Sequence, residues 1–145
     1  MDLQAQAPSK GLMFIEELVF ENGTVYKGYL LNDKKHGPGV QTWPDGSKYE
    51  GEWKEDMASG KGKFVHPDND FYEGEWEIDK AHGYGAYVHA SGSRYLGQWR
   101  NDKQEGIGLD SWKDGSSYDG PYVDGKKHGR GKFVWADGSY YDGNF

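Results

Sequence analysis

Residues 49–64, with the sequence YEGEWKEDMASGKGKF, combine acidic, basic and glycine residues in a way that could serve an enzyme. Carboxylates and lysines can act as general acids and bases, and closely spaced glycines can cradle a phosphate. The same residues also alternate along the chain, as they would in a β-hairpin that carries out no reaction. The rest of the sequence decides between these two interpretations.

The stretch belongs to a 23-residue motif that recurs without insertion or deletion. Each copy opens with Tyr-x-Gly, continues with Gly-x-Gly and, in most copies, closes with Asp-Gly. Self-similarity at a fixed period of this size indicates a repeat array. The five full copies cover residues 26–48, 49–71, 72–94, 95–117 and 118–140, and a sixth begins at Tyr141.

Within each copy the apolar and polar residues alternate with a period of two, which predicts strands. In the second copy Tyr49, Gly51 and Trp53 share one face, and Gly62 and Phe64 share a face of the following strand. Asp-Gly between such runs is a strong hairpin signal, because glycine adopts the positive φ that the turn needs. We therefore predict an all-β protein, an elongated antiparallel meander of hairpins with one hairpin per repeat.

The glycines inside these predicted strands need a compensating contact, because glycine in a strand costs backbone entropy. Aromatic rings from a neighbouring strand can cover such bare backbone. We expect the repeated tyrosines, together with Trp53, Trp76, Trp99 and the residues equivalent to them, to do so.

The candidate chemical motifs are explained by the repeat. His36, His82 and His128 share one position but lie two repeats apart, a separation of about 19 Å in a sheet, whereas a zinc–nitrogen bond is about 2 Å long. The stretch GPYVDGKK imitates a phosphate loop but lacks the Ser or Thr that follows the lysine. The stretch DNDFYEGE resembles a calcium loop only faintly, since its carboxylates fall at turn and outward strand positions. We predict no catalytic residues, no metal and no cofactor.

Composition narrows the classes of partner. The net charge is −7, and no copy of the repeat forms a basic stripe, which argues against nucleic acid as a partner and against polybasic docking on anionic lipid. The chain has no cysteine and no apolar run of about 20 residues. We therefore expect a cytoplasmic protein whose contact with membranes, if any, is indirect.

The pattern Tyr-x-Gly-x-Trp, Gly-x-Gly and Asp-Gly at a 23-residue period resembles the MORN (membrane occupation and recognition nexus) repeat. The resemblance covers residues 26–145 and implies a single-layer, twisted antiparallel sheet with a groove along it. It also implies a role in cytoskeletal, ciliary or membrane-contact assemblies, where such arrays organise partners and self-associate.

The two ends differ from the repeats. We interpret residues 1–11 as a flexible N-terminus and residues 12–25 as a degenerate half-repeat that caps the sheet edge. Because the sequence stops within the pattern of a strand, we expect the chain to be the N-terminal part of a longer protein.

Three functional hypotheses follow. The first is a non-catalytic scaffold that holds a helical or extended protein segment in an aromatic groove, with homodimerisation as an additional mode of assembly. The second is a regulatory array of a larger enzyme, since the resemblance implies MORN repeats before lipid-kinase and lysine-methyltransferase domains. The third, direct lipid binding, is opposed by the charge. The predicted groove residues are Trp53, Phe64, Tyr72, Trp76, Tyr87, Tyr95 and Trp99.

Overall fold

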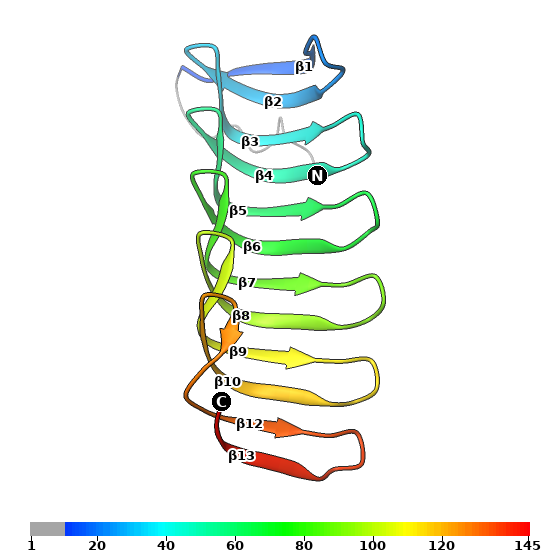
Figure 1. Ribbon diagram of the computed structural model, residues 1–145. Helices are drawn as coiled ribbons and strands as arrows, with labels where there is room; N and C mark the ends of the chain where they lie inside the picture. Colours follow the sequence, from blue (N-terminus) through cyan, green and yellow to red (C-terminus); the bar gives the residue numbers. More distant parts are fainter. Residues whose placement is uncertain (1–10) are drawn as a thin grey trace.

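The computed structural model describes residues 11–145 as one open antiparallel sheet, a single layer of strands that follow one another in chain order (Figure 1). This confirms the predicted all-β meander. Most of the predicted flexible N-terminus, residues 1–10, lies outside the described residues. The strands are β1 (Met13–Val19), β2 (Val25–Leu31), β3 (Lys34–Thr42), β4 (Lys48–Lys54), β5 (Met57–Val65), β6 (Phe71–Glu77), β7 (Lys80–Val88), β8 (Arg94–Arg100), β9 (Lys103–Ser111), β10 (Ser117–Val123), β11 (Lys126–Lys127), β12 (Arg130–Val134) and β13 (Tyr140–Asn144).

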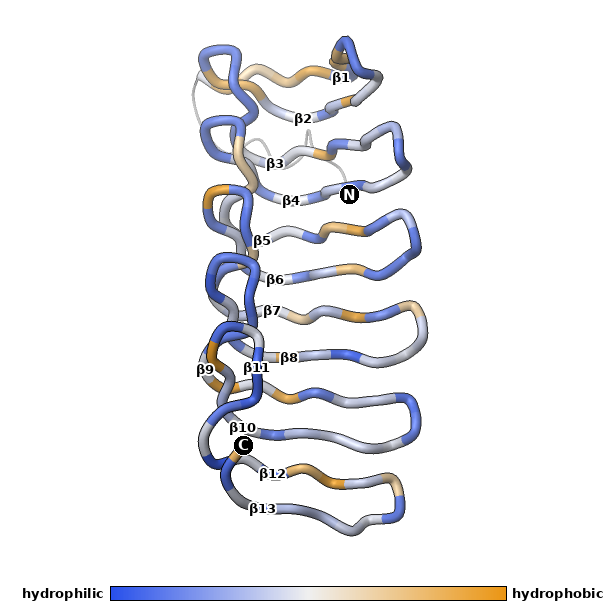
Figure 2. Tube along the Cα trace, viewed as in Figure 1, coloured by the Kyte–Doolittle hydropathy of each residue, from blue (hydrophilic) through white to orange (hydrophobic). Residues whose placement is uncertain are grey.

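Each of the first four repeats is a strand, a two-residue turn and a longer second strand, followed by a loop to the next repeat; in the fifth repeat the second strand is divided into β11 and β12. The two-residue turns lie along one side of the sheet and the longer loops along the other, at the left and right of Figure 1. Apart from β1, the strands are mostly neutral or hydrophilic with short apolar stretches (Figure 2). The sheet is therefore not held together by continuous apolar strands.

Tyrosine rings lying on glycine backbone form the core. The Tyr49 ring covers Gly51 and Gly62, and a Cβ atom added to Gly62 would overlap the tyrosine hydroxyl. That hydroxyl donates a 2.7 Å hydrogen bond to the Glu52 carbonyl, which satisfies its polar end. The arrangement confirms the predicted cover of the glycines, although the ring belongs to the same hairpin as the glycines that it covers. The equivalent buried tyrosines are Tyr26, Tyr72, Tyr95 and Tyr118.

A second ring in each of the second to fifth repeats joins these tyrosines into a continuous row, and Leu30 holds the equivalent position in the first repeat. Tyr49 packs edge-on against Trp53 of its own repeat and Trp76 of the next, with centroid distances of 4.9 and 5.3 Å. The Trp76 indole N–H also donates a 2.9 Å hydrogen bond to the Gly62 carbonyl of the preceding repeat. Such perpendicular pairs are favoured by the ring quadrupoles, so each repeat is tied to both neighbours through its rings.

A carboxylate clip connects the turns of successive repeats. The Ala58 amide donates to Asp79 Oδ1 at 2.7 Å, and the Asp79 amide donates back to the Ala58 carbonyl at 3.1 Å. The same pair of bonds recurs between Lys35 and Asp56 and between Ala81 and Asp102. In the fifth repeat Gly125 replaces the aspartate, and only the backbone half of the clip remains, from Gly125 to the Gln104 carbonyl.

The first strand of each of the first four hairpins contains a register shift, between Gly51 and Trp53 in β4 and at the equivalent positions of β2, β6 and β8. Such bulges bend a strand, and the hairpin tips turn out of the plane of the sheet (Figure 1). In β10 the equivalent position is Pro121, which pairs with Ile107 of β9 but has no partner in the following strand. Its missing N–H is therefore tolerated at this position.

At the N-terminal edge, residues 12–25 contain β1, which pairs with β2 with an irregular register between Ile15 and Leu18. This strand covers the edge of the first repeat. The interpretation of the segment as a degenerate half-repeat stays a prediction.

The contact between tyrosine and glycine predicts the effect of adding one methyl group. We expect Gly62→Ala to lower the free energy of unfolding by about 3 kcal/mol or more, because the methyl group overlaps the Tyr49 hydroxyl. Gly46→Ala is the matched control: Gly46 has a φ of +93° and open space around it, so it should cost only about 1 kcal/mol. Urea unfolding measures both, and equal effects would contradict the packing role of Gly62.

The two-residue turns predict a stabilising substitution. Both central residues of these turns have positive φ, and Ile78, at 50°, is β-branched and exposed. Ile is disfavoured in this conformation, whereas Asn tolerates it and occupies the equivalent positions 32 and 101. We expect Ile78→Asn to raise the free energy of unfolding by about 1 kcal/mol. Ile107→Asn, at an exposed site within β9, should not stabilise the protein; a melting temperature raised by both variants would refute the explanation.

Candidate functional site

A concave groove of about 530 Å³ runs along the tyrosine face of the first four repeats. We call it the aromatic groove. Its floor is the row of tyrosine and tryptophan rings, one wall is formed by the hairpin tips, and the other by side chains near the longer loops. The lining residues are Lys35, Gln41, Trp43, Tyr49, Trp53, Asp56, Ala58, Phe64, His66, Tyr72, Trp76, Asp79, Ala81, Tyr87, Trp99 and Asp102.

The structure gathers six of the seven predicted groove residues at this site, and they differ in exposure. Phe64, Trp76, Tyr87 and Trp99 are half-buried and present ring surface to the groove. Three others are nearly buried, with exposed fractions of 5% for Trp53, 3% for Tyr72 and 2% for Tyr95. Tyr95 does not line the groove, because neighbouring rings cover it on both sides. The half-buried rings thus form the accessible surface of the groove, and the buried ones support it.

The predicted groove residues are all aromatic and leave out the polar wall of the groove. Asp56, Asp79 and Asp102 line the groove at the hairpin tips, one in each of three successive repeats. Their 23-residue spacing is the sequence signal that could have identified them as one row. Each accepts a hydrogen bond from the amide of the preceding repeat, so the clips place a line of carboxylates beside the rings.

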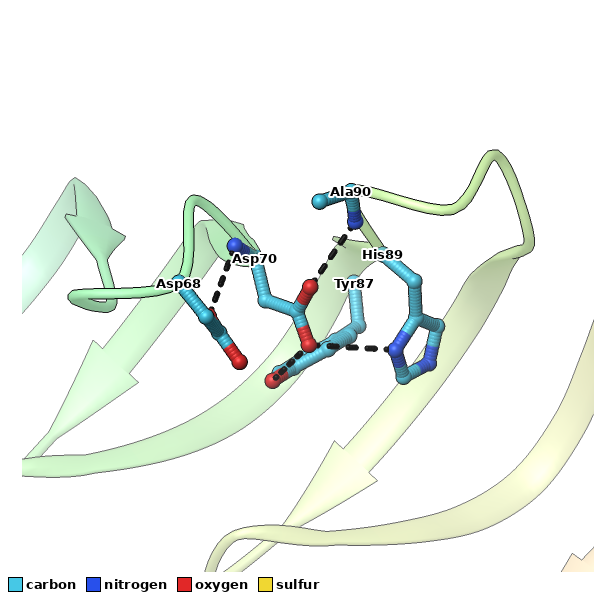
Figure 3. A network of polar contacts seen from close by, with 5 residues as sticks. All are labelled: Asp68, Asp70, Tyr87, His89 and Ala90. Atoms are coloured by element: carbon cyan, nitrogen blue, oxygen red, sulfur yellow. Dashed lines mark hydrogen bonds and ion pairs between the residues drawn. The ribbon is translucent and has the colours of Figure 1, made fainter.

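The opposite wall contains a polar network between the second and third repeats (Figure 3). Asp70 accepts a 2.8 Å hydrogen bond from the Ala90 amide and lies 3.2 Å from His89 Nδ1 and 3.4 Å from the Tyr87 hydroxyl. The Ala90 hydrogen bond is the main cause that holds the pKa of Asp70 below its usual value. The loop between β5 and β6 is thereby attached to the loop between β7 and β8, which positions Tyr87 at the groove.

The core tyrosine hydroxyls on this face serve the structure as hydrogen-bond donors. Burial raises the pKa of the Tyr49 and Tyr72 hydroxyls well above their usual value, so both remain protonated donors at neutral pH. Within residues 11–145 no group of three or more histidine, aspartate and glutamate side chains is arranged to hold a metal ion. That same part of the chain contains no helix suited to crossing a membrane. The arrangement offers ring surface and carboxylates, which suit binding.

Comparisons with known proteins agree with this architecture. The sequence matches the MORN repeat over residues 26–48, 49–71, 72–94, 95–117 and 118–140. No curated protein sequence is significantly similar to the chain. Among solved structures, the chain resembles the TCP domain of SAS-4 from Drosophila melanogaster, which was solved in complex with a proline-rich motif of Ana2. The two have 13% sequence identity and a TM-score of 0.56, and the similarity covers 94% of this chain and 80% of that one.

Five consecutive, in-register matches account for most of the sequence, and the structure has the one-hairpin repeat that the resemblance implies. The chain therefore belongs to the MORN-repeat family.

Proposed function

We propose that this chain is a non-catalytic scaffold that holds a segment of a partner protein in the aromatic groove. The observation that carries the proposal is the set of half-buried rings, Phe64, Trp76, Tyr87 and Trp99, which line one continuous concave surface. Aromatic side chains supply much of the binding energy in protein interfaces. The rings are held by the core and by hydrogen bonds, so little ordering is needed when a partner binds.

The repeat length favours an extended segment. Two strands per repeat place equivalent sites about 9.6 Å apart, and three residues of polyproline II helix span about 9.3 Å. A structurally similar domain is described in complex with a proline-rich motif, which supports an extended ligand along such a sheet. A helix, with about 10.5 Å per seven residues, matches the spacing less closely.

Charge favours a partner with basic residues. The second and third repeats, at the centre of the groove, carry net charges of −3 and −2. Two of the aspartates in this count, Asp56 and Asp79, place negative charge along one wall of the groove. Charge complementarity of this kind steers association and selects partners.

We further propose that the array works in the cytoplasm, within a cytoskeletal, ciliary or membrane-associated assembly. Self-association into a homodimer belongs to the same proposal.

Replacing a groove ring tests the proposed binding site. Peptides selected from a displayed random library against the parent protein should bind Trp76→Ala at least about fivefold more weakly, the loss of a hot spot worth more than 1 kcal/mol. Trp99→Ala should behave in the same way. The matched control is Trp135→Ala, since Trp135 is exposed outside the groove.

Circular dichroism must first show that each variant keeps its β-sheet, because Trp76 also contacts the core tyrosines. Titration calorimetry then gives the affinities. If folded Trp76→Ala and Trp99→Ala proteins bind the peptides as tightly as the parent, the partner uses the loops or the opposite face and the proposed site is wrong.

A further inference from the structure

The chain places one of its own lysines in an aromatic cage at each end of the array. The Lys35 ammonium lies 4.4 Å from the centroid of the Trp53 ring, 5.6 Å from that of Phe20 and 5.9 Å from that of Tyr26. Lys127 lies four repeats later and is 5.3 Å from the centroids of both Trp112 and Tyr118. Ammonium groups are attracted to ring faces at these distances. The two lysines thus occupy equivalent cages.

The equivalent position in the second and third repeats is alanine. The residues that follow Lys35 at steps of 23 are Ala58 and Ala81. Neither side chain reaches the rings as a lysine does, and the exposure of the indoles shows the consequence. Trp53, beneath Lys35, is only 5% exposed, whereas Trp76 and Trp99 are half-buried and open to the groove.

The cages of the second and third repeats keep aromatic residues at the ring positions, although the lysine is absent. Around Ala58, in the second repeat, the equivalent rings are Trp43, Tyr49 and Trp76, one from each of three successive repeats. Around Ala81, in the third repeat, they are His66, Tyr72 and Trp99; all six line the aromatic groove. The perpendicular pairing of tyrosine and tryptophan is also the same: the interplanar angle is 89° for Tyr26 and Trp53 and 88° for Tyr49 and Trp76. The open cages share these ring positions but differ beside them. Lys35 Nζ donates a 2.6 Å hydrogen bond to Gln41 Oε1, whereas the equivalent residues are Phe64 and Tyr87, and Phe64 packs against Trp43 and Trp76.

Carboxylates accompany the cages. Burial lowers the pKa of Lys35, and the nearby Asp56 and Asp79 oppose that effect, which identifies them as the counter-charges of this ammonium. One repeat further on, the corresponding residues are Asp79 and Asp102, which also line the groove. An open cage therefore offers a cation ring surface and nearby negative charge.

We infer that the two open cages bind cationic side chains, lysine or arginine, of the segment held in the groove, one in each of the second and third repeats. The inference rests on the proposed function and adds the chemistry that the groove selects. Since the cages are one repeat apart, about 9.6 Å, an extended segment meets both when its basic residues are three positions apart. The second-repeat cage binds more tightly, because the third has an imidazole in place of one indole.

The fourth repeat has no open cage of this kind. Gln104 occupies the lysine position, and the Tyr122 hydroxyl, at the ring position equivalent to Trp53, is hydrogen-bonded to Asp110. Tyr122 is only 2% exposed. The cationic site is thus confined to the middle of the groove.

The probe is a capped peptide with the sequence Gly-Pro-Lys-Pro-Pro-Lys-Pro-Gly, compared with the same peptide carrying norleucine at both lysine positions. The indole N–H signals of the protein in two-dimensional NMR report binding at each tryptophan. We expect the lysine peptide to shift the signals of Trp76 and Trp99 but not that of Trp53, which Lys35 covers. Norleucine should weaken binding about tenfold or more, the effect of losing two cation–ring contacts.

Variants fill or open a cage. Ala58→Lys supplies the chain's own ammonium to the second-repeat cage and should weaken the lysine peptide about tenfold, and Ala81→Lys should weaken it less. Ala86→Lys is the matched control, since it adds the same charge to β7 outside the groove and should leave affinity unchanged. Lys35→Ala opens the cage at Trp53, whose signal should then shift with the lysine peptide. This gain remains decisive if a lysine substitution unfolds the protein.

The outcomes separate the two proposals. If the norleucine peptide binds as tightly as the lysine peptide and shifts the same signals, the cages do not select cations, but groove binding stands. If neither peptide shifts Trp76 or Trp99, while the peptides selected from the library do, the cage inference is wrong and the proposed function survives. If the selected peptides also leave both signals unchanged, both proposals fail.

Discussion

The contact between each core tyrosine and the glycines of its hairpin is the interaction on which the rest of the structure depends. A single-layer sheet has no second layer to cover its apolar face, so its rings must find apolar surface within the sheet. Bare glycine backbone provides that surface: the Tyr49 ring lies on Gly51 and Gly62, and its hydroxyl is satisfied by a carbonyl three residues away. The ring is thus buried without a covering helix, and the loss of freedom at glycine is offset by the contact.

This solution makes the molecule nearly one-dimensional. Ring contacts, indole hydrogen bonds and the carboxylate clips each connect a repeat only with its neighbours, so stability is close to a sum of similar local terms. Residues that hold the sheet recur in most copies. Positions outside this framework can vary without loss of the fold, and the proposed binding depends on their differences.

The position shared by Lys35, Ala58, Ala81, Gln104 and Lys127 illustrates this freedom. Its backbone forms the same contact with the next repeat whatever the side chain is, because in each of the first four repeats it accepts a hydrogen bond from that repeat through its carbonyl. A lysine closes the aromatic cage beside it, and an alanine leaves the cage open to the groove. In the proposed function, one side chain per repeat therefore sets where the array receives a ligand, while the sheet remains unchanged.

The sequence by itself determined the elements and their order. The 23-residue period, the alternation of two and the Asp-Gly turns predict the hairpins, because these signals are local. The pairing of rings with glycines was also predictable, although not that Tyr49 covers the glycines of its own hairpin. The repeat arithmetic also predicts that histidines at one repeat position lie far apart, since strand spacing is nearly constant.

Only the tertiary structure decided the form of the site. The bulge between Gly51 and Trp53 bends the hairpin tip, and this bend brings the aspartates beside the rings. No residue of the motif predicts the bend. The exposure of each ring likewise depends on what the neighbouring repeats place over it. Tyr95 is covered by Trp99 and Tyr122, and Trp53 by a lysine, whereas Trp76 faces the groove. Accessibility is a property of packing between repeats, and a motif that is the same in each copy cannot encode it.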